Sequence, residues 1–129
     1  MKTSSLKRVL FVGQRPETVD FSDPAIPPGF DAAKIRAGIA EGMQQMMDQG
    51  WQADLLLVKP DFSATSELED QLRKVNYHCV TIGGGIRLPA KSLSLFEALV
   101  NAVHRVAPAA AIAFNTSPQD TAQAAGRWL

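Results

Sequence analysis

Four short apolar runs, each about as long as a β-strand, recur along the 129 residues and constrain the fold more than any other feature. Most of their residues are apolar and they do not alternate strictly with polar ones, which is typical of strands buried on both faces of a parallel sheet. The runs are Val9 to Val12, Asp54 to Val58, Cys79 to Ile82, and Ala110 to Phe114.

Helical patterns separate the apolar runs. The first begins after Asp31, a predicted N-cap, and repeats apolar residues at helical spacing until Gly50. Gly38 and Gly42 lie one turn apart near this stripe, which predicts a close approach of the helix to the sheet. A second, shorter pattern carries Leu68 and Leu72 on one face and charged residues around the rest.

The last two helical patterns begin at recognisable capping residues. One starts near Ser92 or Ser94, where Ser94 and Glu97 match a capping box, and runs to Pro108. The other starts at Ser117, with Pro118 in the first turn, and ends at the C-terminal Trp128 and Leu129. The order of elements is therefore strand, helix, repeated four times.

This order predicts an α/β fold, a three-layer sandwich with a four-stranded parallel sheet and helices on both faces. Right-handed crossovers favour the strand order 2-1-3-4. Residues 1–129 are expected to form a single domain. The fourth strand would lie at a sheet edge, where unpaired backbone groups invite a cover or a partner, so dimerisation through this edge or the C-terminal helix is a hypothesis.

Composition excludes several classes of partner. The 13 basic and 13 acidic residues balance, so no global field attracts nucleic acid or an anionic membrane. The single cysteine forms no internal disulfide and predicts a cytoplasmic protein. The N-terminal apolar run is too short for a signal peptide, and no run reaches the roughly 18 apolar residues of a membrane span.

The segment after the first strand, Gln14 to Phe30, is far longer than a typical strand-to-helix connection. Four prolines restrict its backbone and predict a shaped loop. In open α/β sheets, ligands bind beyond the carboxyl ends of the strands, so this loop is a predicted wall or lid of a site. The alternative is a loop that packs over the sheet, anchored by Phe21 and Phe30.

The third strand leads into Gly83, Gly84 and Gly85, followed by Arg87 and Lys91. Glycines permit close approach of the backbone, and an exposed helix N-terminus with basic side chains favours an anion. The segment matches neither the dinucleotide fingerprint nor the phosphate loop. A tight turn that requires positive φ angles is the equally weighted alternative.

The fourth strand delivers Asn115, Thr116, Ser117 and Asp120 to the same edge of the sheet. At least one of these residues is expected to cap the last helix. The others are candidates for orienting a ligand.

Signals for catalysis are sparse. His78 precedes the third strand, at the end opposite the predicted site, and His104 lies late in a helix. Cys79 falls within a predicted buried strand and is expected to be part of the core. No metal-ligand spacing is recognisable, so no metal site is predicted. Asp20 is the first candidate for an acid or base, although loop aspartates more often bond to nearby backbone.

Three stretches carry a resemblance to known proteins: VDFSDPAIPPGFDAAKIRAGI, IGGGIRLPAKSLSLFEALVNAVHRVAP and IAFNTSPQDTAQAAGRWL. Together they resemble a group of small bacterial single-domain proteins of the Rossmann-like or flavodoxin-like α/β type. The resemblance covers most of the chain after Val9 and implies bacterial origin and a single domain. It implies no activity.

Two functions follow as expectations. The first is binding of a small anionic ligand, bearing phosphate or carboxylate, at the carboxyl edge of the sheet. The second is a non-enzymatic, homodimeric interaction or regulatory module that uses the 14–30 loop and an edge strand. The sequence assigns no cofactor and does not decide whether the protein is an enzyme. The residues expected to bind the anion are Arg15, Gly83, Gly84, Gly85, Arg87, Asn115 and Thr116.

Overall fold

A computed structural model describes residues 6–129. The prediction that the chain has no signal peptide rests partly on residues 1–5. These residues lie outside the described part of the chain. The strands are β1 (Arg8–Gln14), β2 (Gln52–Val58), β3 (Cys79–Ile82) and β4 (Ala111–Phe114). The helices are α1 (Ala32–Asp48), α2 (Ser63–Lys74), α3 (Gly84–Arg87), α4 (Leu93–Val106) and α5 (Thr121–Gly126), with 3-10 turns η2 (Pro16–Thr18), η3 (Ala90–Ser92) and η4 (Pro118–Asp120).

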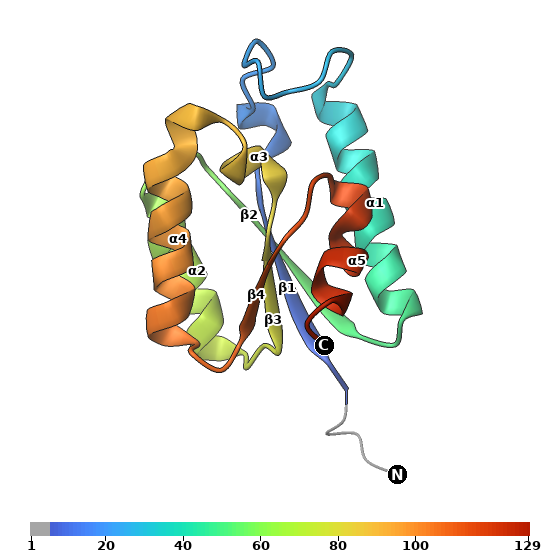
Figure 1. Cartoon of the computed structure of the whole chain (residues 1–129), viewed down its shortest axis with the longest axis vertical. Helices are drawn as coiled ribbons and strands as arrows, with labels where there is room; N and C mark the ends of the chain where they lie inside the picture. Colours follow the sequence, from blue (N-terminus) through green and yellow to red (C-terminus); the bar gives the residue numbers. More distant parts are fainter. Residues whose placement is uncertain (1–5) are drawn as a thin grey trace.

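The four strands form one parallel sheet in the order β2-β1-β3-β4, which confirms the predicted topology. In the register of the central pair, Val9 lies beside Cys79 and Val12 beside Ile82. All strands point to the same edge, and the long loop after β1 crosses above that edge before α1 begins (Figure 1). The connections after β1, β3 and β4 therefore meet at one end of the molecule.

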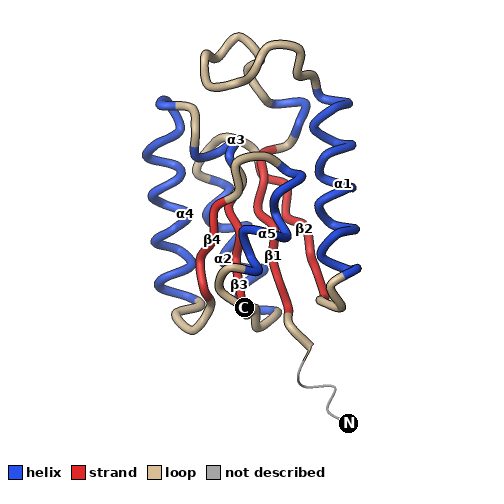
Figure 2. Tube along the Cα trace, turned by 45° about the vertical axis from the view of Figure 1, so that its right-hand side comes forward, coloured by secondary structure: helices blue, strands red, loops and turns tan. Residues whose placement is uncertain are grey.

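Helices cover both faces of the sheet and make a three-layer sandwich. Helices α2 and α4 pack together on one face, and α1 and α5 pack on the other (Figures 1 and 2). Strand β1 explains why both faces need cover, because Leu10 and Val12 enter the core under α2 and α4, whereas Val9 and Phe11 enter the core under α1 and α5. All four side chains are at most 2% exposed.

The predicted positions of α1 and α2 are confirmed, and of the two predicted starts of α4 the one at Ser92 is correct. The last helix, predicted from Ser117 to Leu129, is instead the 3-10 turn η4 followed by the short helix α5, which ends at Gly126. The Asp31 carboxylate accepts a hydrogen bond from Lys34 N at 2.8 Å and caps α1, and Gly50, with φ of +84°, follows its end. The predicted capping box of Ser94 and Glu97 is wrong. The turn η3 leads directly into Leu93, so Ser92 takes the N-cap position without a side-chain bond.

The two glycines of α1 serve a contact other than the predicted one. A Cβ atom on Gly42 would lie 2.3 Å from Pro118 O, and one on Gly38 would lie 2.9 Å from the Gln119 side chain. The close approach is therefore between α1 and the turn η4, and not between α1 and the sheet. This packing holds the connection after β4 against α1.

β2 and β4 are the edge strands of the sheet. On each of them, an arginine side chain donates a hydrogen bond to the last backbone carbonyl that points away from the neighbouring strand. Arg127 Nη2 donates to Phe114 O at 3.1 Å on β4, and Arg15 Nε donates to Leu57 O at 3.4 Å on β2. An arginine side chain over an edge carbonyl hinders the approach of another strand, so both arginines reduce the tendency of the edges to pair with a second chain. Among the described residues, no helix is long and apolar enough to cross a membrane.

Candidate functional site

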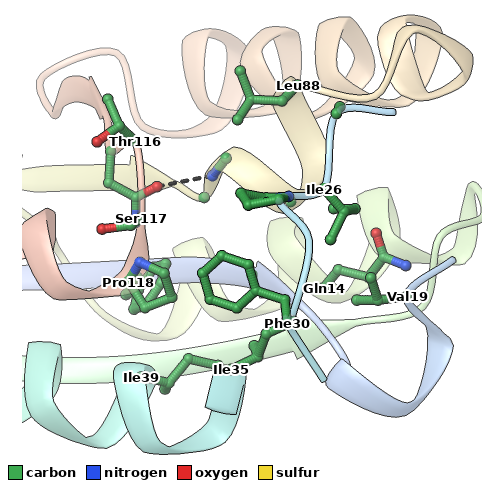
Figure 3. A pocket seen from close by; sticks show the side chains of 18 residues that line it. Gln14, Val19, Ile26, Phe30, Ile35, Ile39, Leu88, Thr116, Ser117 and Pro118 are labelled. Carbon is green, nitrogen blue, oxygen red and sulfur yellow. Dashed lines mark hydrogen bonds between the residues drawn. The ribbon is translucent and has the colours of Figure 1, made fainter. Parts of the chain in front are cut away.

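A cavity of about 370 Å³ lies at the carboxyl edge of the sheet, between the long loop, α1, α3 and the connection after β4 (Figure 3). Its volume falls within the range of small-molecule sites. No lysine, arginine, histidine, aspartate or glutamate of the described residues lines it. The lining consists of Phe11, Gly13, Gln14, Val19, Ala25, Ile26, Pro27, Phe30, Ile35, Ile39, Gly83, Gly84, Gly85, Leu88, Asn115, Thr116, Ser117 and Pro118.

The long loop supplies the outer wall of this cavity. Figure 3 shows Phe30 facing Pro118 across the cavity, with Ile35 and Ile39 of α1 beside it. Phe21, the other aromatic residue expected to anchor the loop, is 38% exposed and does not line the cavity. Besides Gln14 and Val19, the loop residues that line the cavity lie in its second half, from Ala25 to Phe30.

The triglycine segment is not the tight turn that formed the alternative prediction. None of its three glycines has a positive φ, and Gly84 begins the short helix α3. Close packing explains two of them, since a Cβ on Gly83 would lie 3.3 Å from Val12 O and one on Gly84 would lie 3.3 Å from Thr116 O. A Cβ on Gly85 would meet nothing within 4 Å. Gly85 thus borders open space, and packing alone does not require a glycine there.

Asn115 joins three elements at the base of the cavity. Its side-chain Oδ1 accepts from Gly84 N at 2.8 Å, and its Nδ2 donates to Thr121 Oγ1 at 2.9 Å. The residue is 1% exposed. Its polar atoms are therefore committed to holding α3 and α5 against the end of β4.

Thr116 and Ser117 lie at the rim, and their polar groups take part in the start of the last helical segment. Ser117 and Asp120 form a reciprocal capping box at η4, which confirms that this cluster caps a helix. Thr116 N donates to Asp120 Oδ1 at 2.9 Å, and the Thr116 hydroxyl also contacts this carboxylate. Both hydroxyl groups reach the cavity wall while they stabilise the turn.

Arg87 is turned away from the cavity. Its Nη2 donates to Asn115 O at 2.9 Å, and its guanidinium lies 5.9 Å from the centre of the Phe114 ring. Its Nε is buried and has no partner among the described residues. The guanidinium therefore packs over the end of β4 and lines no part of the cavity.

Arg15 lies even further from the predicted cluster. Besides its bond to Leu57 O, its guanidinium is 3.9 Å from the Glu67 carboxylate of α2. It borders a groove between α1 and β2 instead of the cavity. The structure thus brings together Gly83, Gly84, Gly85, Asn115 and Thr116, and it places the two arginines elsewhere.

A second, more polar cavity of about 330 Å³ adjoins the first, and Gln14, Val19, Ile26 and Gly85 line both. Asp20 and Lys91 lie here, with Asp20 Oδ2 2.5 Å from Lys91 Nζ. The hydrogen bonds from Lys91 and Ser22 lower the pKa of Asp20 to about 2. A carboxylate with so low a pKa is a poor proton acceptor at neutral pH.

The thiol and the imidazoles lie where the sequence places them. Cys79 is buried in β3, and burial raises the pKa of its thiol, so the reactive thiolate is disfavoured. His78 Nδ1 accepts from Arg8 N at 3.0 Å at the opposite end of the sheet, and His104 is exposed in the last turn of α4. Within residues 6–129, no three His, Cys, Asp or Glu side chains are grouped closely enough to hold a metal ion.

Comparison of the chain with protein families, curated proteins and solved structures finds no match.

The sequence predicts the long loop, the triglycine segment and the residues after β4 that line the cavity, but it misses six lining residues, which are Phe11, Gly13, Ile35, Ile39, Leu88 and Pro118. Ile35 and Ile39 belong to the apolar stripe of the first helix, whose spacing predicts packing against the sheet, and polar residues at strand ends give no signal for an apolar wall. Leu88 offers one usable signal, since an apolar residue stands beside the triglycine segment in a predicted loop. It is 46% exposed in the structure.

Proposed function

We propose that this protein binds a small, uncharged and mainly apolar molecule in the cavity at the carboxyl edge of the sheet. The observation that carries the proposal is the absence of any ionisable side chain from the lining that the structure describes. Placing an ion among such walls costs desolvation energy that no opposite charge offsets. An apolar ligand gains by leaving water in the same place.

Polar groups at the rim would orient one end of such a ligand. The Gln14 side chain donates through Nε2 to Thr18, which leaves its Oε1 as an acceptor without a partner among the described residues. The Gly85 N–H likewise has no acceptor within the described chain. One donor and one acceptor beside apolar walls fit a ligand with an apolar body and a small hydrogen-bonding head.

The anionic ligand expected from the sequence is the competing proposal. Its support is reduced to backbone and hydroxyl groups, because Arg15 and Arg87 are held by other partners. We propose that the protein binds a ligand, and we assign no acid or base role to Asp20. Its carboxylate is paired with Lys91, and Asp20 does not line the apolar cavity. A cytoplasmic location and bacterial origin accompany the proposal as expectations.

Two fluorescent probes separate the neutral ligand from the anionic one. N-phenyl-1-naphthylamine and 8-anilino-1-naphthalenesulfonate share one aromatic body and differ by a sulfonate, so titration of the protein with each measures the effect of charge alone. We expect the neutral probe to bind more tightly by about tenfold or more, the factor that 1.4 kcal/mol of ion desolvation produces. Tighter binding of the sulfonate would support the anionic ligand instead.

A matched pair of variants locates the binding. Gly85→Leu adds a side chain in open space beside the cavity, and Ala33→Leu adds a similar side chain on an exposed part of α1 that does not line it. We expect Gly85→Leu to weaken binding of the neutral probe and Ala33→Leu to leave it unchanged. Equal affinities in both variants would place the probe elsewhere and overturn the proposal.

A homodimeric interaction module is the second candidate. The observation in its favour is that Phe21 at the loop and Trp128 beyond α5 are 38% and 62% exposed. Large aromatic side chains are enriched in protein interfaces. Sedimentation equilibrium of the wild type and of Phe21→Ser and Trp128→Ser tests it. A dimer that both substitutions dissociate supports this candidate, and a monomeric wild type rejects it.

A further inference from the structure

One wall of the cavity is formed by a loop. Residues 19–30, named here the strap, supply five of its lining residues, which are Val19, Ala25, Ile26, Pro27 and Phe30. The strap joins η2 to α1 and passes above the ends of the strands, as the loop at the top of Figures 1 and 2 shows. Access to the apolar cavity from this side therefore depends on where the strap lies.

The backbone of the strap makes no backbone–backbone hydrogen bond to the rest of the described fold between residues 20 and 30. Between residues 20 and 30 its described backbone bonds all stay inside the loop, from Asp23 N to Asp20 O, from Ile26 N to Asp23 O and from Phe30 N to Pro27 O. Asp20 and Asp23 also use their carboxylates to close local turns. The strap is thus an internally bonded unit that can move as a whole without breaking a sheet or helix bond.

Its two ends are held differently. At the α1 end, Lys34 Nζ donates to Gly29 O at 2.6 Å, and Gly29 has a φ of +87°, a conformation that glycine adopts without strain. On the opposite rim, Lys91 Nζ lies 2.5 Å from Asp20 Oδ2 and 3.8 Å from Asp23 Oδ2. Among the described residues, Lys91 is the one side chain of the α3–α4 connection with a polar bond to the strap.

The ion pair is exposed, with 59% of the Lys91 side chain and 47% of the Asp20 side chain accessible. Exposed ion pairs are weak and salt screens them, so this contact opens often. The α1 end is continuous with a helix and contains Gly29 at a positive φ, whereas the far rim is held through this exposed ion pair. That arrangement is the one a hinged cover needs.

We propose that the strap is a hinged cover of the apolar cavity, that Lys91 latches it through Asp20 and Asp23, and that ligand exchange requires the latch to open. The inference rests on the proposed function for its ligand. The movement of the strap itself does not depend on which ligand is bound.

Stopped-flow mixing with N-phenyl-1-naphthylamine tests the latch. Lys91→Met keeps most of the side-chain stem and removes the charge, and Lys74→Met is the matched control on α2, because Lys74 is exposed and forms no ion pair within the described residues. We expect Lys91→Met to raise association and dissociation rates by about twofold to fivefold, the factor that loss of an exposed ion pair produces. Added salt should raise both rates in the wild type and in Lys74→Met, and should change them little in Lys91→Met.

Hydrogen exchange of the Gly85 amide, measured without a probe, keeps the test independent of the proposed function, because this N–H has no acceptor within the described chain and Gly85 lines the cavity that the strap covers. Faster exchange of this amide in Lys91→Met than in Lys74→Met supports the latch even if the probe fails to bind, which would overturn the proposed function alone. Unchanged exchange in Lys91→Met overturns the latch. Faster exchange with unchanged probe rates would show that the ligand uses another route, and would overturn the role of the latch in ligand exchange.

Discussion

Single polar residues determine how the ends of the elements fit together. Asn115 is the main example, because it serves a backbone donor of α3 and a side chain of α5 from one buried position. Tyr77 joins β2 and α2 on the other face of the sheet. Its hydroxyl donates to Asp54 Oδ2 at 2.6 Å and accepts from Gln71 Nε2 at 2.7 Å. Buried polar atoms cost free energy when a partner is removed, so both residues can be tested.

Asn115→Ala should destabilise the protein by about 2–4 kcal/mol, because it leaves the buried Gly84 N–H unpaired and removes the bond to Thr121. Urea unfolding measures the loss. Asn101→Ala, at an exposed position of α4, is the control and should change stability by less than about 0.7 kcal/mol, the range of helix propensity. Equal effects of the two substitutions would contradict the role given to Asn115.

The single tyrosine makes a titration specific for one residue. Burial, followed by the hydrogen bond to Asp54, raises the pKa of Tyr77 from about 10 to about 12. A raised pKa of an acid means that the folded state favours the neutral hydroxyl, so its contribution to stability is complete below pH 10 and is lost as the pH rises through about 12. Ultraviolet absorbance of tyrosinate should show this midpoint, and ionisation near the ordinary value in the folded protein would refute it.

At the scale of elements, glycines set how closely helices approach their neighbours. Gly83 and Gly84 allow α3 to sit against the ends of β1 and β4, and Gly42 allows α1 to contact η4. The groups that face Gly42 and Gly38 differ in how easily they can move to make room for a methyl group. Backbone atoms oppose Gly42, whereas the end of an exposed side chain opposes Gly38.

This difference predicts opposite outcomes for two alanine substitutions in one helix. Gly42→Ala should destabilise the protein by about 1–3 kcal/mol, because its methyl group would displace the Pro118 carbonyl and overpacking has this cost. Gly38→Ala should be neutral or stabilise by up to about 1 kcal/mol, since Gln119 can rotate away and alanine favours helix. Thermal unfolding of both variants compares them, and a greater loss in Gly38→Ala would contradict the packing described.

At the scale of the whole molecule, the two edges of the small sheet control self-association. Arg15 follows β1 and bonds to a carbonyl on the outer side of edge strand β2. Arg127 follows α5 and bonds to a carbonyl on the outer side of edge strand β4. Such covers are a usual protection of exposed edges.

Replacing both with alanine should therefore increase self-association of the protein. Sedimentation velocity at increasing concentration measures the effect, and Arg105→Ala is the control, because Arg105 pairs with Glu69 between α2 and α4 and touches neither edge. The same average mass for the double variant and the control would show that these arginines do not protect the edges.

The sequence by itself determined the four strands, their parallel order, four of the helices and the edge at which a site would lie. The elements follow from the periodicity of apolar residues and from capping residues, which are local signals, and the parallel order follows from the preference for right-handed crossovers between successive strands. It also placed the long loop over that edge correctly. The capping box at Ser94 failed because η3 carries the chain into α4 at Leu93, two residues earlier than an N-cap at Ser94 would place it.

Only the tertiary structure decided what lines the cavity. The directions of Arg15 and Arg87 depend on partners far away in the chain, Leu57, Glu67 and Asn115, and no local pattern encodes those contacts. The apolar walls come from residues of α1, the loop and α3 that meet only when the layers pack. A basic residue near a strand end is therefore a weak guide to charge in a cavity, because its long side chain can bond to several neighbours and packing selects one.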